Sequence, residues 1–230
     1  MSFYEELLAS TAGERDALLS QPLFADALAG RVTVPLYIAF LTQAYHHVKH
    51  TVPLMMACGA RLNGDREWLR ARLVSYIQEE YGHHEWVLSD IEASGGDAEA
   101  ARCSDPAFET EMMVAYAYDV IARGNPVGFL GMVHVLEGTS TALATRAAER
   151  IADALRLPPK AFSYLSSHGS LDLSHVDFFR ETVDRLGAAD QAAVVRAARR
   201  FYGLYGGIFQ RLHREHVQQQ ASRREVIECA

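Results

Sequence analysis

Residues 161–180 read AFSYLSSHGSLDLSHVDFFR, and the rest of the chain must fold around this stretch. An α-helix turns by about 100° per residue, so Asp172 lies about 40° and His175 about 20° from the direction of His168. Apolar and aromatic side chains fall within about 80° of the same direction: Tyr164, Leu165, Leu171, Val176 and Phe179. The stretch therefore predicts a helix whose apolar stripe carries two imidazoles and one carboxylate.

These three polar residues have two interpretations. They can satisfy one another as a buried His–Asp–His hydrogen-bond cluster, because an unpaired polar group in a core costs several kcal/mol. Three ligand-type residues at i, i+4 and i+7 on one helix face favour a metal site instead. One helix cannot complete a coordination shell, so this hypothesis requires carboxylates or imidazoles from other helices.

A second candidate lies in a helix predicted to run without interruption from the turn at Asn63-Gly64 to Gly95-Gly96. Glu80 and His83 lie on either side of its apolar direction, and their i, i+3 spacing lets both reach one ion. Glu79 and His84 lie towards the edges of the stripe. Since His84 is rotated by about 100° from His83, we expect His83 to be the ligand.

Glu137 is the third candidate, within the most apolar helix of the chain, VGFLGMVHVLEGTSTALATRAAERIADAL. It lies among apolar residues of one stripe, where an unpartnered carboxylate would be protonated or destabilising. Gly131 and Gly138 are expected to permit close approach of another helix. A metal-bridging Glu137 is one hypothesis; the other pairs it with neutral His134, about 60° away on the same helix.

Composition and the positions of helix-breaking residues indicate one soluble all-α domain. The 230 residues are 49% hydrophobic with a formal net charge of −7, which favours neither nucleic acid nor a membrane surface as partner. The start lacks signal-peptide features, and three scattered cysteines, Cys58, Cys103 and Cys229, read as reduced thiols, so we expect a cytoplasmic protein. We assign residues 1–217 to the helical domain and 218–230 to a flexible C-terminal tail.

Local signals divide this domain into helices. Thr33 is expected to cap a helix with Pro35 in its first turn, and Pro53 to bend or break that helix near residues 50–53. Asn125-Pro126 starts the Glu137 helix, and Gly187 precedes a last long helix.

Together, three helices offer six ligands: Glu80, His83, Glu137, His168, Asp172 and His175. Mixed carboxylate and imidazole ligation suits two iron or manganese ions better than structural zinc, which favours thiolates. A ferritin-like site needs two Glu-x-x-His pairs, and the chain has only one. His47, Tyr76, Tyr164 and His134 are candidate walls of a substrate pocket, although aromatic stripes are more often plain core.

The motifs Glu79-Glu80-Tyr81-Gly82-His83, isolated Glu137 and His168/Asp172/His175 resemble those of the haem-oxygenase-like di-iron oxidases and oxygenases. The resemblance runs from the YHHVKHTVP segment to His175 and fills all six ligand places. It implies a haem-oxygenase-like bundle of about seven helices. It also implies two iron ions as cofactor and O₂ as co-substrate, for N-oxygenation, desaturation or C–C cleavage of an amino-acid-like or fatty-acid-like small molecule.

Relatives on the same fold supply the alternatives. Thiaminase-II (TenA-like) proteins and pyrroloquinoline-quinone synthases are metal-free; the former need a nucleophilic cysteine, here Cys58 or Cys103. A helical metal-storage or regulatory protein would bind iron without substrate-dependent O₂ uptake. For the oxidase we expect an external electron donor and a homodimer.

Overall fold

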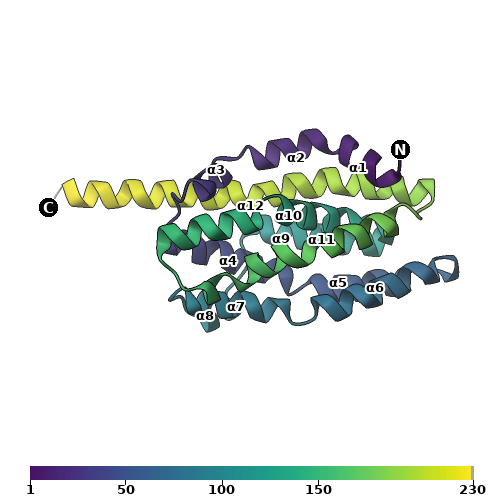
Figure 1. Cartoon of the computed structure of the whole chain (residues 1–230), viewed down its shortest axis with the longest axis horizontal. Coiled ribbons are helices and arrows are strands. Elements are labelled where there is room, and N and C mark those ends of the chain that lie inside the picture. Colours follow the sequence, from purple (N-terminus) through teal and green to yellow (C-terminus); the bar gives the residue numbers. More distant parts are fainter. Residues whose placement is uncertain (229–230) are drawn as a thin grey trace.

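The computed structural model describes residues 1–228, and the side chains of these residues except 142–143, 167–175 and 223–228. All regular secondary structure in this part of the chain is helical (Figure 1), which confirms the predicted all-α class. The α-helices are α1 (Phe3–Ser10), α2 (Ala12–Leu19), α3 (Pro22–Leu28), α4 (Val34–Val48), α5 (Thr51–Arg61), α6 (Glu67–Glu80), α7 (His83–Ala93), α8 (Ala98–Cys103), α9 (Phe108–Arg123), α10 (Leu130–Leu155), α11 (Ser163–Val183) and α12 (Ala188–Glu228). Three 3₁₀ turns join them: η1 (Gly64–Arg66), η2 (Pro126–Phe129) and η3 (Pro159–Phe162).

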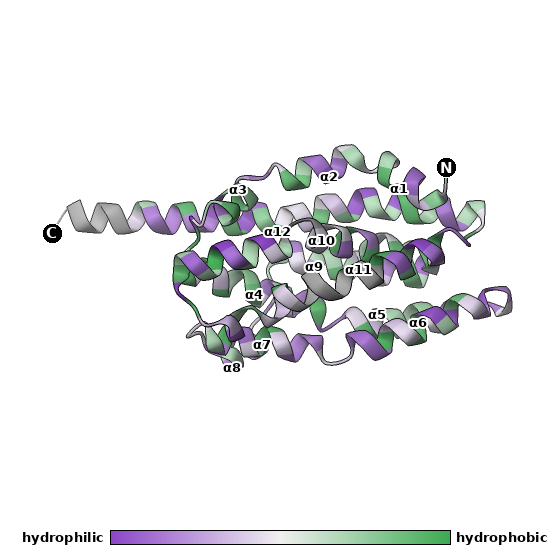
Figure 2. Ribbon diagram, viewed as in Figure 1, coloured by the Kyte–Doolittle hydropathy of each residue, from purple (hydrophilic) through white to green (hydrophobic). Residues whose placement is uncertain are grey.

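The helices form an elongated bundle around α10, α11 and α12. In Figure 1, α12 runs along the whole bundle, α1 and α2 lie against one side of it, and α5 and α6 form a hairpin at the opposite edge. Figure 2 shows hydrophobic and hydrophilic residues interleaved along most helices, as amphipathic helices require. Their apolar faces meet in one buried cluster that extends from Leu7 in α1 to Leu212 in α12.

Several predicted boundaries are confirmed. The Thr33 hydroxyl accepts a hydrogen bond from the Leu36 amide at 3.4 Å and so caps α4. The helix is interrupted between Val48, where α4 ends, and Thr51, where α5 starts, just before Pro53. Proline cannot continue the hydrogen-bond ladder of a helix. The Asn125 side chain accepts a bond from the Val127 amide and starts η2, which leads into α10.

The predicted continuous helix through Glu80 and His83 is wrong. The structure ends α6 at Glu80 and starts α7 at His83. Gly82 between them has φ of 93°, a left-handed conformation that only glycine adopts readily. The two residues therefore sit at the facing ends of two helices rather than on one helix face.

The helix count is roughly consistent with the predicted bundle of about seven helices, because several of the α-helices in the described part of the chain are short. The N-terminal 30 residues form three separate short helices, and the Asn63–Gly96 region forms two with a 3₁₀ turn before them. The last helix, α12, continues to Glu228 and so includes residues that the sequence analysis assigns to the C-terminal tail. Within the described residues no single helix is long and apolar enough to span a membrane; one pair of segments, Pro126–Thr141 and Ala144–Leu155, reaches that length and composition together, but with a 49° bend.

Candidate metal centre and its cavity

Glu80 and His83 lie side by side at the junction of α6 and α7. His83 Nδ1 is 3.0 Å from Glu80 Oε2, and the two side chains are only 3% and 10% exposed. The Trp86 ring stacks on the imidazole with a centroid distance of 4.1 Å and covers it from solvent. Although the helix is interrupted at Gly82, Glu80 and His83 are still in contact, as expected from their i, i+3 spacing.

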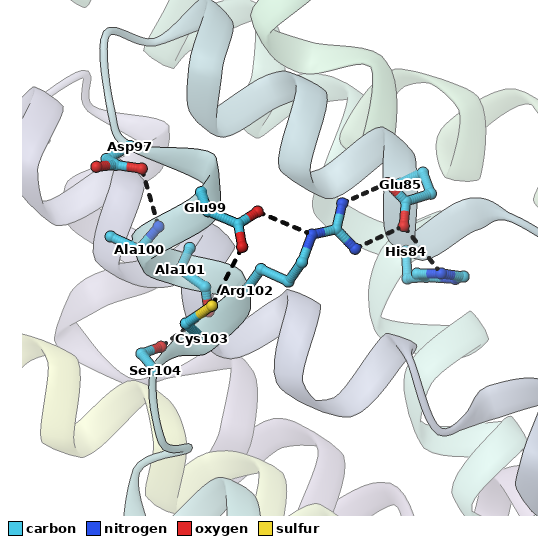
Figure 3. A network of polar contacts seen from close by, with 9 residues as sticks. All are labelled: His84, Glu85, Asp97, Glu99, Ala100, Ala101, Arg102, Cys103 and Ser104. Atoms are coloured by element: carbon cyan, nitrogen blue, oxygen red, sulfur yellow. Dashed lines mark hydrogen bonds and ion pairs between the residues drawn. The ribbon is translucent and has the colours of Figure 1, made fainter.

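His84 and Glu79 lie elsewhere. His84 Nε2 is 3.2 Å from Glu85 Oε1 and belongs to a surface network in which Arg102 joins Glu85 and Glu99 (Figure 3). Glu79 is exposed. Of the two neighbouring histidines, His83 is therefore the one placed beside Glu80.

Glu137 in α10 lies close to Tyr76 in α6. The negative charge of Glu137 acts on the Tyr76 hydroxyl. Burial raises the pKa of Tyr76, and the negative charges of Glu137 and then Glu80 raise it further. The charges of both carboxylates therefore reach one buried phenol, and Glu80 and Glu137 also line one cavity. Glu137 itself is half-buried.

Hydroxyl side chains after Glu137 explain the bend of α10. Thr139 donates to the carbonyl of Val135 at 2.6 Å, and Thr141 donates to the carbonyl of Glu137 at 2.9 Å. Such bonds compete with the helical ladder and commonly bend a helix. The second half of α10 is therefore turned relative to the half that carries Glu137.

A cavity of about 170 Å³ adjoins these carboxylates. Glu80 and Glu137 are the only acidic residues among its described lining residues, and none of these described residues is a lysine or an arginine. The remaining walls are predominantly apolar and come from α3, α4, α5, η2, α10, α11 and α12: Leu23, Phe24, Ala27, Val32, Leu36, Tyr37, Phe40, His47, Val48, Thr51, Leu54, Met55, Phe129, Met132, Val133, Leu136, Thr139, Ser140, Ala144, Ala147, Ile151, Tyr164, Leu165, Tyr205 and Phe209.

Two of the four predicted pocket residues, His47 and Tyr164, line this cavity. Tyr76 contacts the site through Glu137 without lining the cavity. His134 also lies outside the cavity wall. Its Nε2 is 3.3 Å from the Thr11 hydroxyl and 3.5 Å from the Tyr202 hydroxyl, so its hydrogen-bond partners come from α12 and the α1–α2 junction. His134 is thus paired with these two hydroxyls, and not with Glu137 as the alternative hypothesis predicts.

The other three predicted ligands, His168, Asp172 and His175, lie outside the residues whose side chains the structure describes. Their backbone belongs to α11, as the opening stretch predicts. Among the described side chains, no group of three or more His, Cys, Asp or Glu residues is arranged to hold one ion.

The start of α11 is fixed by Asp90, a residue that the sequence analysis did not select. This carboxylate of α7 is fully buried and accepts hydrogen bonds from the Tyr164 amide at 2.8 Å, the Ser163 amide at 3.1 Å and the Ser163 hydroxyl. Burial raises its pKa, whereas these hydrogen bonds act in the opposite direction. A buried aspartate that caps a helix from another helix leaves no local sequence signal, because its partners are 73 and 74 residues away.

The donor groups present fit an iron site. A carboxylate and an imidazole, here Glu80 and His83, are ligand types that iron accepts, and the two side chains are in contact. Glu137 lines the same cavity as Glu80 and offers a second carboxylate. Two carboxylates that share a poorly hydrated site repel each other, and a cation between them removes that cost.

The arrangement of the helices is that of the haem-oxygenase-like fold, as solved structures of this fold show. Within that class, a profile of the iron-containing redox enzymes matches residues 38–206, and the chain belongs to this family.

Solved structures agree with this assignment. A domain of unknown function with a haem-oxygenase-like fold from Shewanella denitrificans is 26% identical, with a TM-score of 0.84 over 94% of both chains. A TenA homologue from Pseudomonas syringae pv. tomato is 12% identical, with a TM-score of 0.76 over 92% of this chain and 93% of the other. Haem oxygenase-1 from Synechocystis, in complex with haem, is 12% identical, with a TM-score of 0.74 over 97% of both chains. A comparison with curated protein sequences gives no match.

Proposed function

We propose that this protein is an O₂-dependent non-haem di-iron oxidase or oxygenase whose substrate is fatty-acid-like. The observation that carries the proposal is that Glu80 of α6, which His83 of α7 contacts, and Glu137 of α10 both line one apolar cavity. His168, Asp172 and His175 of α11 would complete the ligand set. When bound, the iron ions would supply the redox chemistry for O₂ reduction, with further electrons from an external donor.

The described residues have separate roles in this proposal. Glu80, His83 and Glu137 would hold metal, and the Tyr76 hydroxyl, on which the charge of Glu137 acts, is available to orient that carboxylate. Trp86 covers the His83 ring, and the apolar cavity wall excludes water from the substrate side of the site. Since burial and two carboxylates raise the pKa of Tyr76, its hydroxyl remains a proton donor at neutral pH.

The cavity favours a fatty-acid-like over an amino-acid-like substrate. A free amino acid carries two charged groups, and burying either without a partner is costly. No lysine or arginine is present among the described lining residues to pair a second carboxylate or to balance Glu80 and Glu137. A substrate with a single acidic group at the metal and an aliphatic chain against the apolar wall buries no second charge and needs no lysine or arginine partner.

A thiaminase-like reaction is the second candidate, and the described thiols do not favour it. Cys58 is buried, its Sγ is 3.3 Å from the Pro126 carbonyl, and burial raises the pKa of this thiol to about 12. Cys103 is exposed on α8, and the neighbouring Glu99 raises its pKa (Figure 3). Neither lines the cavity, so neither is placed as a nucleophile for a bound substrate.

Anaerobic Fe(II) loading of wild type, His83→Ala and His84→Ala tests the proposal. We expect two iron ions per wild-type and His84→Ala chain, and one or none in His83→Ala, because only His83 adjoins Glu80. Iron content and circular dichroism of each variant separate lost ligation from misfolding. O₂ uptake should then rise with dodecanoate and not with a panel of amino acids. Wild-type protein that remains iron-free but binds a ligand tightly would support the metal-free alternative instead.

A further inference from the structure

The cavity is asymmetric about the carboxylates. Along α10 its lining residues run from Met132 through Glu137 to Ile151. Three of them precede Glu137, within five residues of it, and five follow it, as far as fourteen residues away, so most of the α10 lining lies on the Ile151 side. The longer part, here called the long arm, is formed by α3, the N-terminal half of α4 and the second half of α10.

Contacts at both ends of the cavity show which helix ends lie together. An added Cβ at Gly30, just after α3, would lie 3.1 Å from the Ala154 side chain, so the start of α4 adjoins the end of α10. At the other end the Cys58 thiol of α5 contacts the Pro126 carbonyl. Helices α4 and α10 are therefore antiparallel, and Leu36 of α4 lies at the same end of the cavity as Ile151.

One wall of the long arm is a row of aromatic rings. Phe209 of α12 contacts Phe24 of α3 with a centroid distance of 4.5 Å, Tyr205 at 4.8 Å and Phe40 of α4 at 6.1 Å. All four rings line the cavity. This row gives a continuous apolar surface that leads from the interior towards α3.

Small side chains on α3 and α10 leave space beside these rings. Ala27 of α3 and Ala144 and Ala147 of α10 line the arm, and no charged side chain among its described lining residues lies beyond Glu137 in this direction. A polar substituent would lose its hydrogen bonds to water here, whereas each buried methylene gains roughly fourfold in affinity. The geometry points to an unbranched aliphatic chain as the occupant.

We propose that the long arm binds the distal end of a single aliphatic chain and that Ala27, Ala144 and Ala147 set the chain length that the protein accepts. A larger side chain at any of these positions would shorten the arm without changing Glu80, His83 or Glu137. The inference rests on the proposed function only for the polar head of the ligand, which it takes to lie at the carboxylates.

The test is calorimetric binding of two homologous series to the full-length protein, with and without Fe(II) under argon. One series is octanoate, dodecanoate and hexadecanoate; the other is the matching n-alkylamines. In wild type, affinity should rise with chain length. Ala147→Phe should weaken the longest ligand at least tenfold and leave the eight-carbon ligands unchanged.

Thr145→Phe on the exposed face of α10 is the matched control and should bind like wild type. Ala27→Phe, on the opposite wall, repeats the test should Ala147→Phe fail to fold. Equal weakening of all chain lengths, or no length dependence in wild type, would overturn the inference. Length-dependent binding by a protein that takes up no iron would leave the inference standing while the proposed function fails.

Discussion

At the scale of single residues, His134 shows how packing decides the role of a buried polar group. Its ring stacks on Phe179 with a centroid distance of 6.0 Å and is 3% exposed. Burial lowers its pKa to about 4, and the positive charge of Arg15 contributes in the same direction. The ring is therefore neutral in the folded protein at neutral pH and acts as a hydrogen-bonding core residue.

This residue makes stability depend on pH. Because the folded-state pKa of about 4 lies below the ordinary value of 6.5, the unfolded chain takes up a proton first as the pH falls. The free energy of unfolding should drop by about 2 kcal/mol between about pH 7 and pH 5 through His134 alone. Urea unfolding over this range should show a smaller drop for His134→Gln than for wild type. Parallel slopes for the two proteins would contradict a neutral buried His134.

At the scale of helices, the junctions carry more of the site than the helix faces do. The left-handed Gly82 turns the chain between Glu80 and His83, and Asp90 ties α7 to the first residues of α11. A carboxylate at a helix N-terminus satisfies free amides and interacts favourably with the helix dipole. Since Tyr164 and Leu165 line the cavity, the Asp90 cap also fixes part of its wall.

Removal of this cap should lower the free energy of unfolding. Asp90→Ala leaves the Ser163 and Tyr164 amides without their acceptor in a buried setting, for an expected loss of roughly 2–4 kcal/mol in unfolding free energy. Asp90→Asn keeps one acceptor oxygen and should lose less. Hydrogen exchange at the Ser163 and Tyr164 amides is the direct measurement, and it should accelerate most in Asp90→Ala. Unchanged exchange at both amides would rule out the capping role.

At the scale of the whole molecule, the distance between α10 and α12 holds the cavity wall in place. An added Cβ at Gly131 would lie 2.6 Å from the Ala198 amide nitrogen and 2.8 Å from the Val194 carbonyl oxygen, both in the α12 backbone. Gly138, expected from the sequence to serve the same purpose, has no atom of the described residues within 4 Å of such a Cβ. Of these two glycines, Gly131 is therefore the close-approach position.

Substitution of these two glycines by alanine should therefore have opposite effects on the stability of the fold. Gly131→Ala should push α10 away from α12 and destabilise the fold by roughly 1–3 kcal/mol. Gly138→Ala should stabilise it by about 0.5–1 kcal/mol, because alanine is the better helix former and meets no neighbour. Thermal unfolding of both variants gives the comparison. A stable Gly131→Ala protein would mean that the two helices can separate without loss.

The sequence by itself determined the helical class and several helix ends, and it predicted the residue types of the candidate site. Periodicity of about 3.6 residues reports which face of a helix is apolar, and caps and prolines report where it starts or stops. These local signals were sufficient for the Thr33 cap, the break before Pro53, and the expectation that His83 rather than His84 accompanies Glu80.

Only the tertiary structure decided which of these faces meet. The break at Gly82, the hydroxyl partners of His134 and the Asp90 cap all depend on residues far apart in the chain or on one backbone angle. The long arm of the cavity depends on α3 and α12 lying opposite α10. Periodicity specifies the direction of a side chain from its own helix axis, whereas the packing of other helices specifies what that side chain contacts.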